Sequence, residues 1–131
     1  MIFVVFEWIR GWLLPYPFWI KDLGKKGEYL ARRYWHRRGY HLVARNHHIG
    51  KGEIDAIMAN YKQVIFLEVK SRTWRPDLRF SEQLTHEQKR RLLHLSHIWT
   101  GQWSEKPPSR FYLMVIVFRD KDFEIQTARI N

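Results

Sequence analysis

The chain contains no cysteine among its 131 residues. Disulfide frameworks and thiolate metal sites are therefore excluded, and a cytoplasmic location is the expected default. Acidic residues are also scarce, since 13 of them stand against 23 lysines and arginines, which gives a formal net charge of +10. A basic surplus of this size favours partners that carry phosphate, either nucleic acid or an anionic membrane surface.

The sequence also lacks internal repeats, low-complexity tracts and a glycine-rich phosphate loop of the Walker type, so we expect no small-molecule cofactor of that kind. What it has in quantity is apolar: 45% of the residues are hydrophobic and 16% are aromatic, which excludes a disordered chain. Its length suits one domain with a single buried core.

Residues 1–21 are expected to be an aromatic extension ahead of a domain over residues 22–131. Two charges and two prolines make this stretch a poor membrane span. It also lacks the basic leader and the small-residue cleavage site of a signal peptide. We predict a short helix up to about Leu14, ended by Pro15, whose apolar side packs on the domain or on a second subunit in a homodimer. Attachment to a membrane surface is the alternative.

Two helices are predicted within the domain. Residues 22–38 place apolar side chains on one face at helical spacing, with Asp22 as the N-terminal cap and Gly39 as the stop. Residues 85–102 repeat that spacing after a Thr-x-x-Gln capping box. Both helices carry basic residues on their other faces.

Strands are predicted between and after the helices. Residues 40–47 alternate apolar and polar side chains and form the first strand. Residues 111–118 are an unbroken apolar run, typical of a central strand covered on both faces, and residues 123–127 alternate as an edge strand. With a hairpin over residues 52–70, the order helix, three strands, helix, two strands predicts an α/β fold with a mixed sheet.

The hairpin carries the most informative charges. Two alternating apolar runs flank Asn60–Gln63, and a turn at that point places Asp55 opposite Glu68. Strand alternation then puts Glu53, Asp55 and Ile57 on one face, and Glu68 and Lys70 together on one face of the returning strand. Directly opposed like charges repel each other, so something must offset the repulsion.

A hard divalent cation such as Mg²⁺ would offset it, because this ion takes oxygen ligands from one or two carboxylates together with waters and phosphate. Lys70 would then hold a water or a phosphate oxygen, which completes a site for metal-assisted hydrolysis of a phosphodiester. The alternative is a solvated strand face on which Lys70 merely balances Glu68.

The spacing of Asp55, Glu68 and Lys70 resembles that of the PD-(D/E)XK nuclease superfamily. Together with the string Gly52-Glu53-Ile54-Asp55, it is similar to the YraN-like (UPF0102) family, which is related to Holliday-junction resolvases. The resemblance implies a restriction-endonuclease-like fold, nuclease activity on DNA, and Mg²⁺ or Mn²⁺ held by Asp55, Glu68 and the carbonyl of Val69. A non-catalytic nucleic-acid-binding or accessory protein with the same fold is the rival interpretation.

The segment Gly27–Ala31 is also similar to the opening of this family, and the resemblance implies that Glu28 is a third acidic contributor to catalysis. On spacing alone, Glu28 can equally be a helix charge paired with Arg32. The same resemblance places Lys89 near the scissile phosphate. The basic residues expected to contact nucleic acid are Lys51, Arg72, Arg75, Lys89 and Arg90, of which two belong to an arginine-rich and aromatic loop over residues 71–80.

Overall fold

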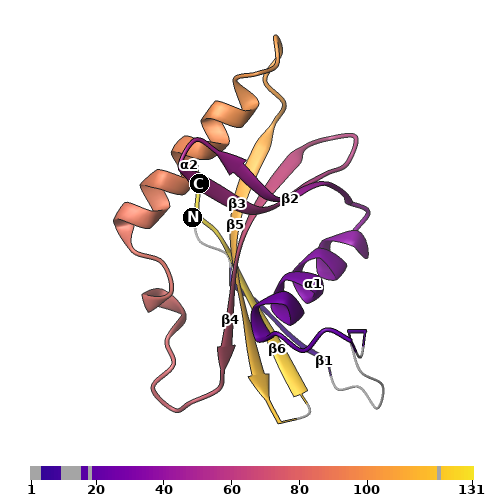
Figure 1. Cartoon of the computed structure of the whole chain (residues 1–131), viewed down its shortest axis with the longest axis vertical. Coiled ribbons are helices and arrows are strands. Elements are labelled where there is room, and N and C mark those ends of the chain that lie inside the picture. The colour runs from indigo at the N-terminus through magenta and orange to yellow at the C-terminus, as the bar shows by residue number, and fades with distance from the viewer. Residues whose placement is uncertain (1–3, 10–15, 18, 121) are drawn as a thin grey trace.

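The computed structural model describes residues 4–9, 16–17, 19–120 and 122–131, and for residues 4–9 it describes the backbone alone (Figure 1). The elements in chain order are β1 (Val4–Ile9), α1 (Leu23–His36), β2 (His41–Ile49), β3 (Gly52–Ala59), β4 (Val64–Thr73), the 3-10 helix η1 (Phe80–Glu82), α2 (His86–Thr100), β5 (Ser109–Arg119) and β6 (Asp122–Arg129).

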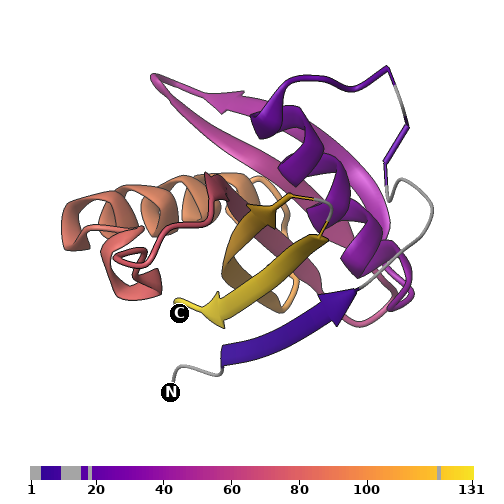
Figure 2. The same cartoon turned by 90° about the horizontal axis from the view of Figure 1, so that it is seen from below.

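The six strands form one sheet in the order β1-β6-β5-β4-β3-β2. Among the described strands, β4 and β5 are the one parallel pair, because α2 carries the chain back between them, and the other neighbours are antiparallel. Figure 2 shows the sheet between its two helices, α1 on one face and α2 on the other. The predicted α/β class and the order of the elements from α1 to β6 are confirmed.

The predicted N-terminal helix is wrong for the described part of that segment, since residues 4–9 are the strand β1, which pairs antiparallel with β6. Tertiary pairing overrides the helical pattern here, because the exposed edge of β6 offers backbone partners along its length. The predicted end of that helix at Leu14 and Pro15 lies outside the described residues. The strand predicted at residues 123–127 is present as β6, but its prediction as an edge strand is wrong, because β1 pairs with it on the outer side.

The local sequence rules hold within the domain. The Asp22 carboxylate accepts the Lys25 N–H at 2.9 Å and starts α1, and Gly39 ends the following turn with φ +89. Thr85 and Gln88 form the capping box of α2. Asn60 closes the turn between β3 and β4, since its side chain accepts the N–H groups of Lys62 and Gln63, each at 2.9 Å.

The sheet has a core on each face. On the α1 side, Leu30, Ala31, Tyr34 and Trp35 pack against residues of β3 to β6, among which Met114 accepts the Trp35 indole N–H at 3.2 Å. On the α2 side, Leu92, Leu95 and Trp99 pack against the opposite faces of β3, β4 and β5. The strand β5 is buried on both sides, as its unbroken apolar run predicts.

Within the described part of the chain, no helix is both long enough and apolar enough to cross a membrane. The division of the chain at residue 21, the cytoplasmic location and the homodimer stay predictions.

Candidate active site

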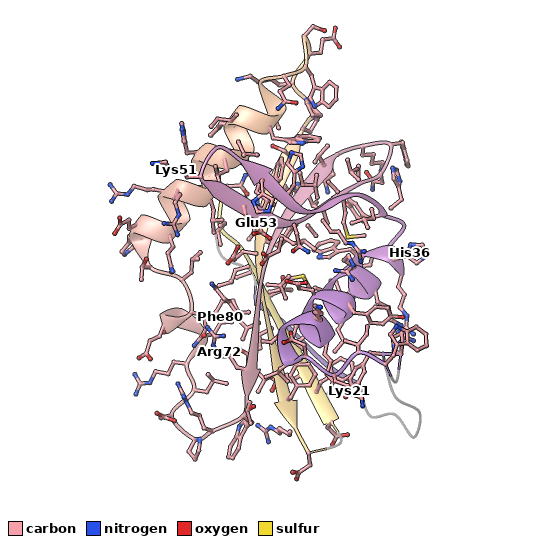
Figure 3. All side chains as sticks on the ribbon, in the orientation of Figure 1. Lys21, His36, Lys51, Glu53, Arg72 and Phe80 are labelled. Carbon is pink, nitrogen blue, oxygen red and sulfur yellow. The ribbon has the colours of Figure 1, made fainter. Side chains whose placement is uncertain are left out.

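Asp55 and Glu68, two of the three predicted acidic site residues, meet in a cleft between α2 and the hairpin of β2 and β3. The cleft has a volume of about 680 Å³. Figure 3 shows Lys51 at the tip of the hairpin beside α2, with Glu53 farther along β3. The residues that line the cleft are Ile49–Glu53, Asp55, Glu68, Lys70, Leu84, Gln88, Arg91, Leu92, His94, Leu95 and Ile98.

Strand β4 supplies Glu68 and Lys70. Its register with β5 runs without a break from Val64 to Thr73, so alternate side chains keep to fixed faces over its whole length. Phe66 belongs to the core beneath α2, and the residues two and four positions later therefore face the same side. The Lys70 ammonium lies 3.0 Å from a carboxylate oxygen of Glu68, and only 23% and 14% of these two side chains are exposed.

Strand β3 supplies Asp55 at a point where the sheet pairing is interrupted. The pairing of β3 with β4 runs from Ala59 to Ala56 and stops, although its register would place Asp55 opposite Glu68 as predicted. On the other side, the pairing of β2 with β3 omits Asn46 and Asp55, and Asn46 has a positive φ of 47. The Asp55 carboxylate instead accepts the Val69 N–H at 2.7 Å. The side chain thus replaces a main-chain acceptor of the ladder.

One residue of β3 departs from the strict alternation of faces. Glu53 and Asp55 line the cleft beside α2, and Ile57 packs beneath the same helix, so these three residues share a face as predicted. Ile54 also joins the core beneath α2, although it lies an odd number of residues from Ile57. A sequence pattern of period two does not predict such a departure.

Burial and charge act together on Asp55. Desolvation by the surrounding protein, followed by the charge of Glu68, raises the pKa of Asp55 to about 7 against an ordinary value of 3.8, while the Val69 N–H acts in the opposite direction. Glu28 and Glu53 add smaller contributions that raise the same pKa. An acidic pair of this kind favours either a proton or a cation between its members.

Glu28 does not complete a cluster with the pair. It lies on α1 in a second hollow beside Arg32 and Arg45, on the other side of the β2 and β3 hairpin from α2. Burial is the main cause that raises the pKa of Glu28, and Arg32 opposes it. Among the described residues, no three acidic or histidine side chains lie close enough together to hold a metal ion.

The predicted nucleic-acid contacts are scattered. Lys51 lines the cleft, whereas Lys89 and Arg90 on α2 do not. The Arg72 guanidinium donates to Gln83 at 2.7 Å and to the Ser71 carbonyl at 2.9 Å, so it ties η1 to β4 (Figure 3).

The fifth predicted contact, Arg75, lies in the loop after β4. It is exposed and pairs with Asp77 at 3.2 Å. Like the other predicted contacts, it stays a prediction.

The sequence-based site missed two residues of the cleft wall. Arg91 and His94 lie on the side of α2 that faces the cleft, together with Gln88. Gln88, Arg91 and His94 follow one another at intervals of three residues, so they lie on one side of the helix. Leu95, two helical turns after Gln88, lies on that side as well. Helical spacing counted from the capping residue Gln88 would have selected them ahead of Lys89 and Arg90.

Comparisons with known proteins give one family. The model of the "Uncharacterised protein family UPF0102" matches residues 27–116. A UPF0102 protein of Symbiobacterium thermophilum is 36% identical over 92 residues, which cover 70% of this chain and 78% of the relative. A UPF0102 protein of Herminiimonas arsenicoxydans is 31% identical over 94 residues, which cover 72% and 76%. The matched segment contains Asp55, Glu68, Lys70 and the cleft wall of α2.

Proposed function

The chain belongs to the UPF0102 family, and we propose that it is a metal-dependent nuclease that hydrolyses phosphodiester bonds in DNA, with a preference for branched or single-stranded structures. The observation that carries the proposal is the convergence of Asp55 and Glu68 in one cleft, where burial first and the charge of Glu68 second raise the pKa of Asp55 to about 7. The fold and the motif residues are consistent with the PD-(D/E)XK superfamily.

The donor set fits Mg²⁺ or Mn²⁺. Asp55 engages one carboxylate oxygen with the Val69 N–H, which leaves its second oxygen for a ligand. Magnesium commonly takes one or two carboxylates from the protein and fills its remaining positions with waters and phosphate oxygens, so a third acidic ligand is not needed. Asp55, Glu68 and the Val69 carbonyl would hold the ion, which when bound would polarise the phosphate and lower the pKa of a bound water.

The chain's own residues account for the other requirements of hydrolysis. The Lys70 ammonium, 3.0 Å from Glu68, would hold the attacking water or a phosphate oxygen beside the carboxylates. Lys51, Arg91 and His94 rim the cleft, and a guanidinium can bind a phosphate group through two parallel hydrogen bonds. These groups would orient the DNA backbone over the acidic floor.

Cleavage of a branched and a single-stranded DNA with Mg²⁺ or Mn²⁺ tests the proposal. Asp55→Ala and Glu68→Ala should each abolish cleavage and retain DNA affinity, because the metal ligands and the phosphate contacts are separate groups. Glu105→Ala removes an exposed acid of the loop after α2 and is the matched control with full activity. Cleavage that survives both cleft substitutions would refute the proposed site.

Binding should also weaken steeply with salt, since a protein that neutralises phosphates on duplex DNA loses affinity with a slope of about −0.9 per phosphate contacted. A flat salt dependence would contradict an electrostatic DNA interface.

A binding protein without catalysis is the second candidate. The net charge of +10 and the cations that line the cleft support nucleic-acid binding independently of catalysis. Metal titration separates the two functions, because a nuclease of this kind should gain thermal stability from Mn²⁺ through Asp55. A binding module should show no stabilisation that Asp55→Ala removes.

A further inference from the structure

A second hollow lies across the β2 and β3 hairpin from the cleft. It has a volume of about 420 Å³, which is in the range of small-ligand sites. Residues of α1, of β2 and of the segment before α1 surround it. Its lining consists of Trp19, Ile20, Lys25, Glu28, Arg32, Arg45 and Asn46.

The charges of this hollow are unbalanced. Three cations, Lys25, Arg32 and Arg45, surround one carboxylate, that of Glu28. No hydrogen bond or ion pair joins the side chain of any of these cations to another described residue. Arg32 is half-buried; burial first and the charge of Arg45 second lower its pKa, and the charge of Glu28 acts in the opposite direction. An arrangement of this kind is relieved by an anionic ligand.

The hollow also has an aromatic wall. The Trp19 side chain is 68% exposed, although it lies in the lining of a concave site. A largely exposed indole beside guanidiniums is a combination found in sites for single-stranded nucleic acids, since an unpaired base stacks on the ring and the adjoining phosphate binds the cations. Bases within a duplex are already stacked and do not offer this contact.

We propose that this hollow binds a nucleotide of a single-stranded nucleic acid, with its phosphate on Lys25, Arg32 and Arg45 and its base against Trp19. The identity of the ligand as nucleic acid rests on the proposed function. The Glu28 carboxylate lies among these cations and offsets one positive charge, which leaves a positive surplus for the phosphate. The site gives the protein a contact outside the cleft, which would favour substrates that carry an unpaired strand next to the cleaved bond.

Equilibrium binding in EDTA tests the site without cleavage. The probes are a short thymine oligonucleotide and an abasic strand of equal length. Arg45→Glu should weaken binding of both strands about tenfold and reduce the salt slope by about 0.7, the contribution of one phosphate on a single strand. Arg37→Glu is the matched control, since it makes the same charge change at an exposed position on the neighbouring helix end, and it should change affinity less than about twofold.

Trp19→Ala separates base stacking from charge. It should weaken binding of the thymine strand about tenfold and leave the abasic strand unchanged. Equal losses for Arg45→Glu and Arg37→Glu, or equal behaviour of the two strands with Trp19→Ala, would overturn the proposal. Lys25→Glu gives a second exposed substitution in the hollow, with the same expected loss as Arg45→Glu.

The two proposals fail separately. If the wild-type chain cleaves no DNA but the difference between Arg45→Glu and Arg37→Glu persists, the nuclease is refuted and the hollow stands. If Asp55 and Glu68 are required for cleavage but Arg45 and Arg37 behave alike, the hollow is refuted and the nuclease stands.

Discussion

The two strands that carry the acidic pair are held in different ways. The pairing of β4 with β5 runs without a break, and β4 carries Glu68 and Lys70 on one face. Strand β3 stops pairing with β4 before Asp55, whose side chain takes over as acceptor, while its register with β2 continues on either side of this residue. Backbone pairing with β5 therefore fixes one half of the site, whereas a side-chain hydrogen bond joins the other half to β4. The difference means that substitutions on β4 separate chemistry from structure, whereas a substitution at Asp55 changes both.

Among the substitutions that compare the two strands, the largest expected effect is at Lys70, on the strand whose pairing with β5 is unbroken. Lys70→Ala should reduce cleavage by about a hundredfold or more, because it removes the group that orients water or phosphate, and it should retain the stabilisation by Mn²⁺. Cleavage rates and thermal unfolding with and without Mn²⁺ measure the two properties. Lys62→Ala at the exposed turn between the strands is the control. Loss of the Mn²⁺ effect in Lys70→Ala would mean that β4 is not the independent platform that its pairing indicates.

Substitutions at two glycines test whether β4 is more rigid than the β2 and β3 hairpin. A Cβ at Gly27 of α1 would collide with the Ser71 side chain of β4. The backbone of β4 around Ser71 is held by its continuous pairing with β5. We expect Gly27→Ala to lower the free energy of unfolding by about 2 kcal/mol, and Ser71→Gly in the same chain to restore most of it. A Cβ at Gly52 of β3 would meet only the end of Leu95, 2.6 Å away, so Gly52→Ala should cost about 1 kcal/mol or less.

Chemical denaturation of these variants measures the differences. Equal losses for Gly27→Ala and Gly52→Ala would show that the hairpin is as rigid as β4.

The pH dependence of stability tests the interrupted half. Since the pKa of Asp55 is raised from 3.8 to about 7 in the folded chain, the folded state binds more protons than the unfolded state between these values. The wild type should therefore lose stability as the pH rises from about 4 to about 7. In EDTA at pH 8, Asp55→Asn should be more stable than the wild type by about 2 kcal/mol, because the amide oxygen still accepts the Val69 N–H and no charge is buried.

Thermal unfolding across this pH range measures the effect. The two proteins should be equally stable near pH 4, and addition of Mn²⁺ at pH 8 should stabilise the wild type alone. A constant difference at every pH would mean that Asp55 does not carry the proton.

The smallest effects on stability are expected from substitution of two arginines, Arg72 near the end of β4 and Arg75 in the loop that follows. Arg72→Ala should cost about 1 kcal/mol, because it removes the hydrogen bond to Gln83 that holds η1 against β4. Arg75→Ala should change stability by less than about 0.5 kcal/mol, because its ion pair with Asp77 is exposed. If Arg75 contacts phosphate, its substitution should weaken DNA binding all the same, and binding assays separate that contribution from folding.

Local patterns were sufficient for much of the fold. Asp22, the pair of Thr85 and Gln88, and the Asn60 turn each act within a few residues of themselves, so the sequence predicts both helices and the hairpin. The apolar run of β5 predicts its central place for a similar reason, since a strand buried on both faces has no polar face to alternate. The strand β1 was missed because its partner β6 lies at the far end of the chain.

The sequence predicted the main acidic residues of the site, but it predicted less of how the surrounding elements pack around them. The register through Asn60 and Gln63 placed Asp55 near Glu68, since a turn fixes the register of the strands that follow it. Three features depend on how α1, α2 and the hairpin pack: the burial of Asp55, the position of Glu28 in a separate hollow, and the choice of Arg91 over Lys89.

The sequence by itself determined the secondary structure of the domain, the acidic pair with its lysine, and the family, because these depend on local spacing. Only the tertiary structure decided which cations face which hollow and how strongly water is excluded from Asp55. Burial and charge act through space, and neighbours in space come from distant parts of the chain.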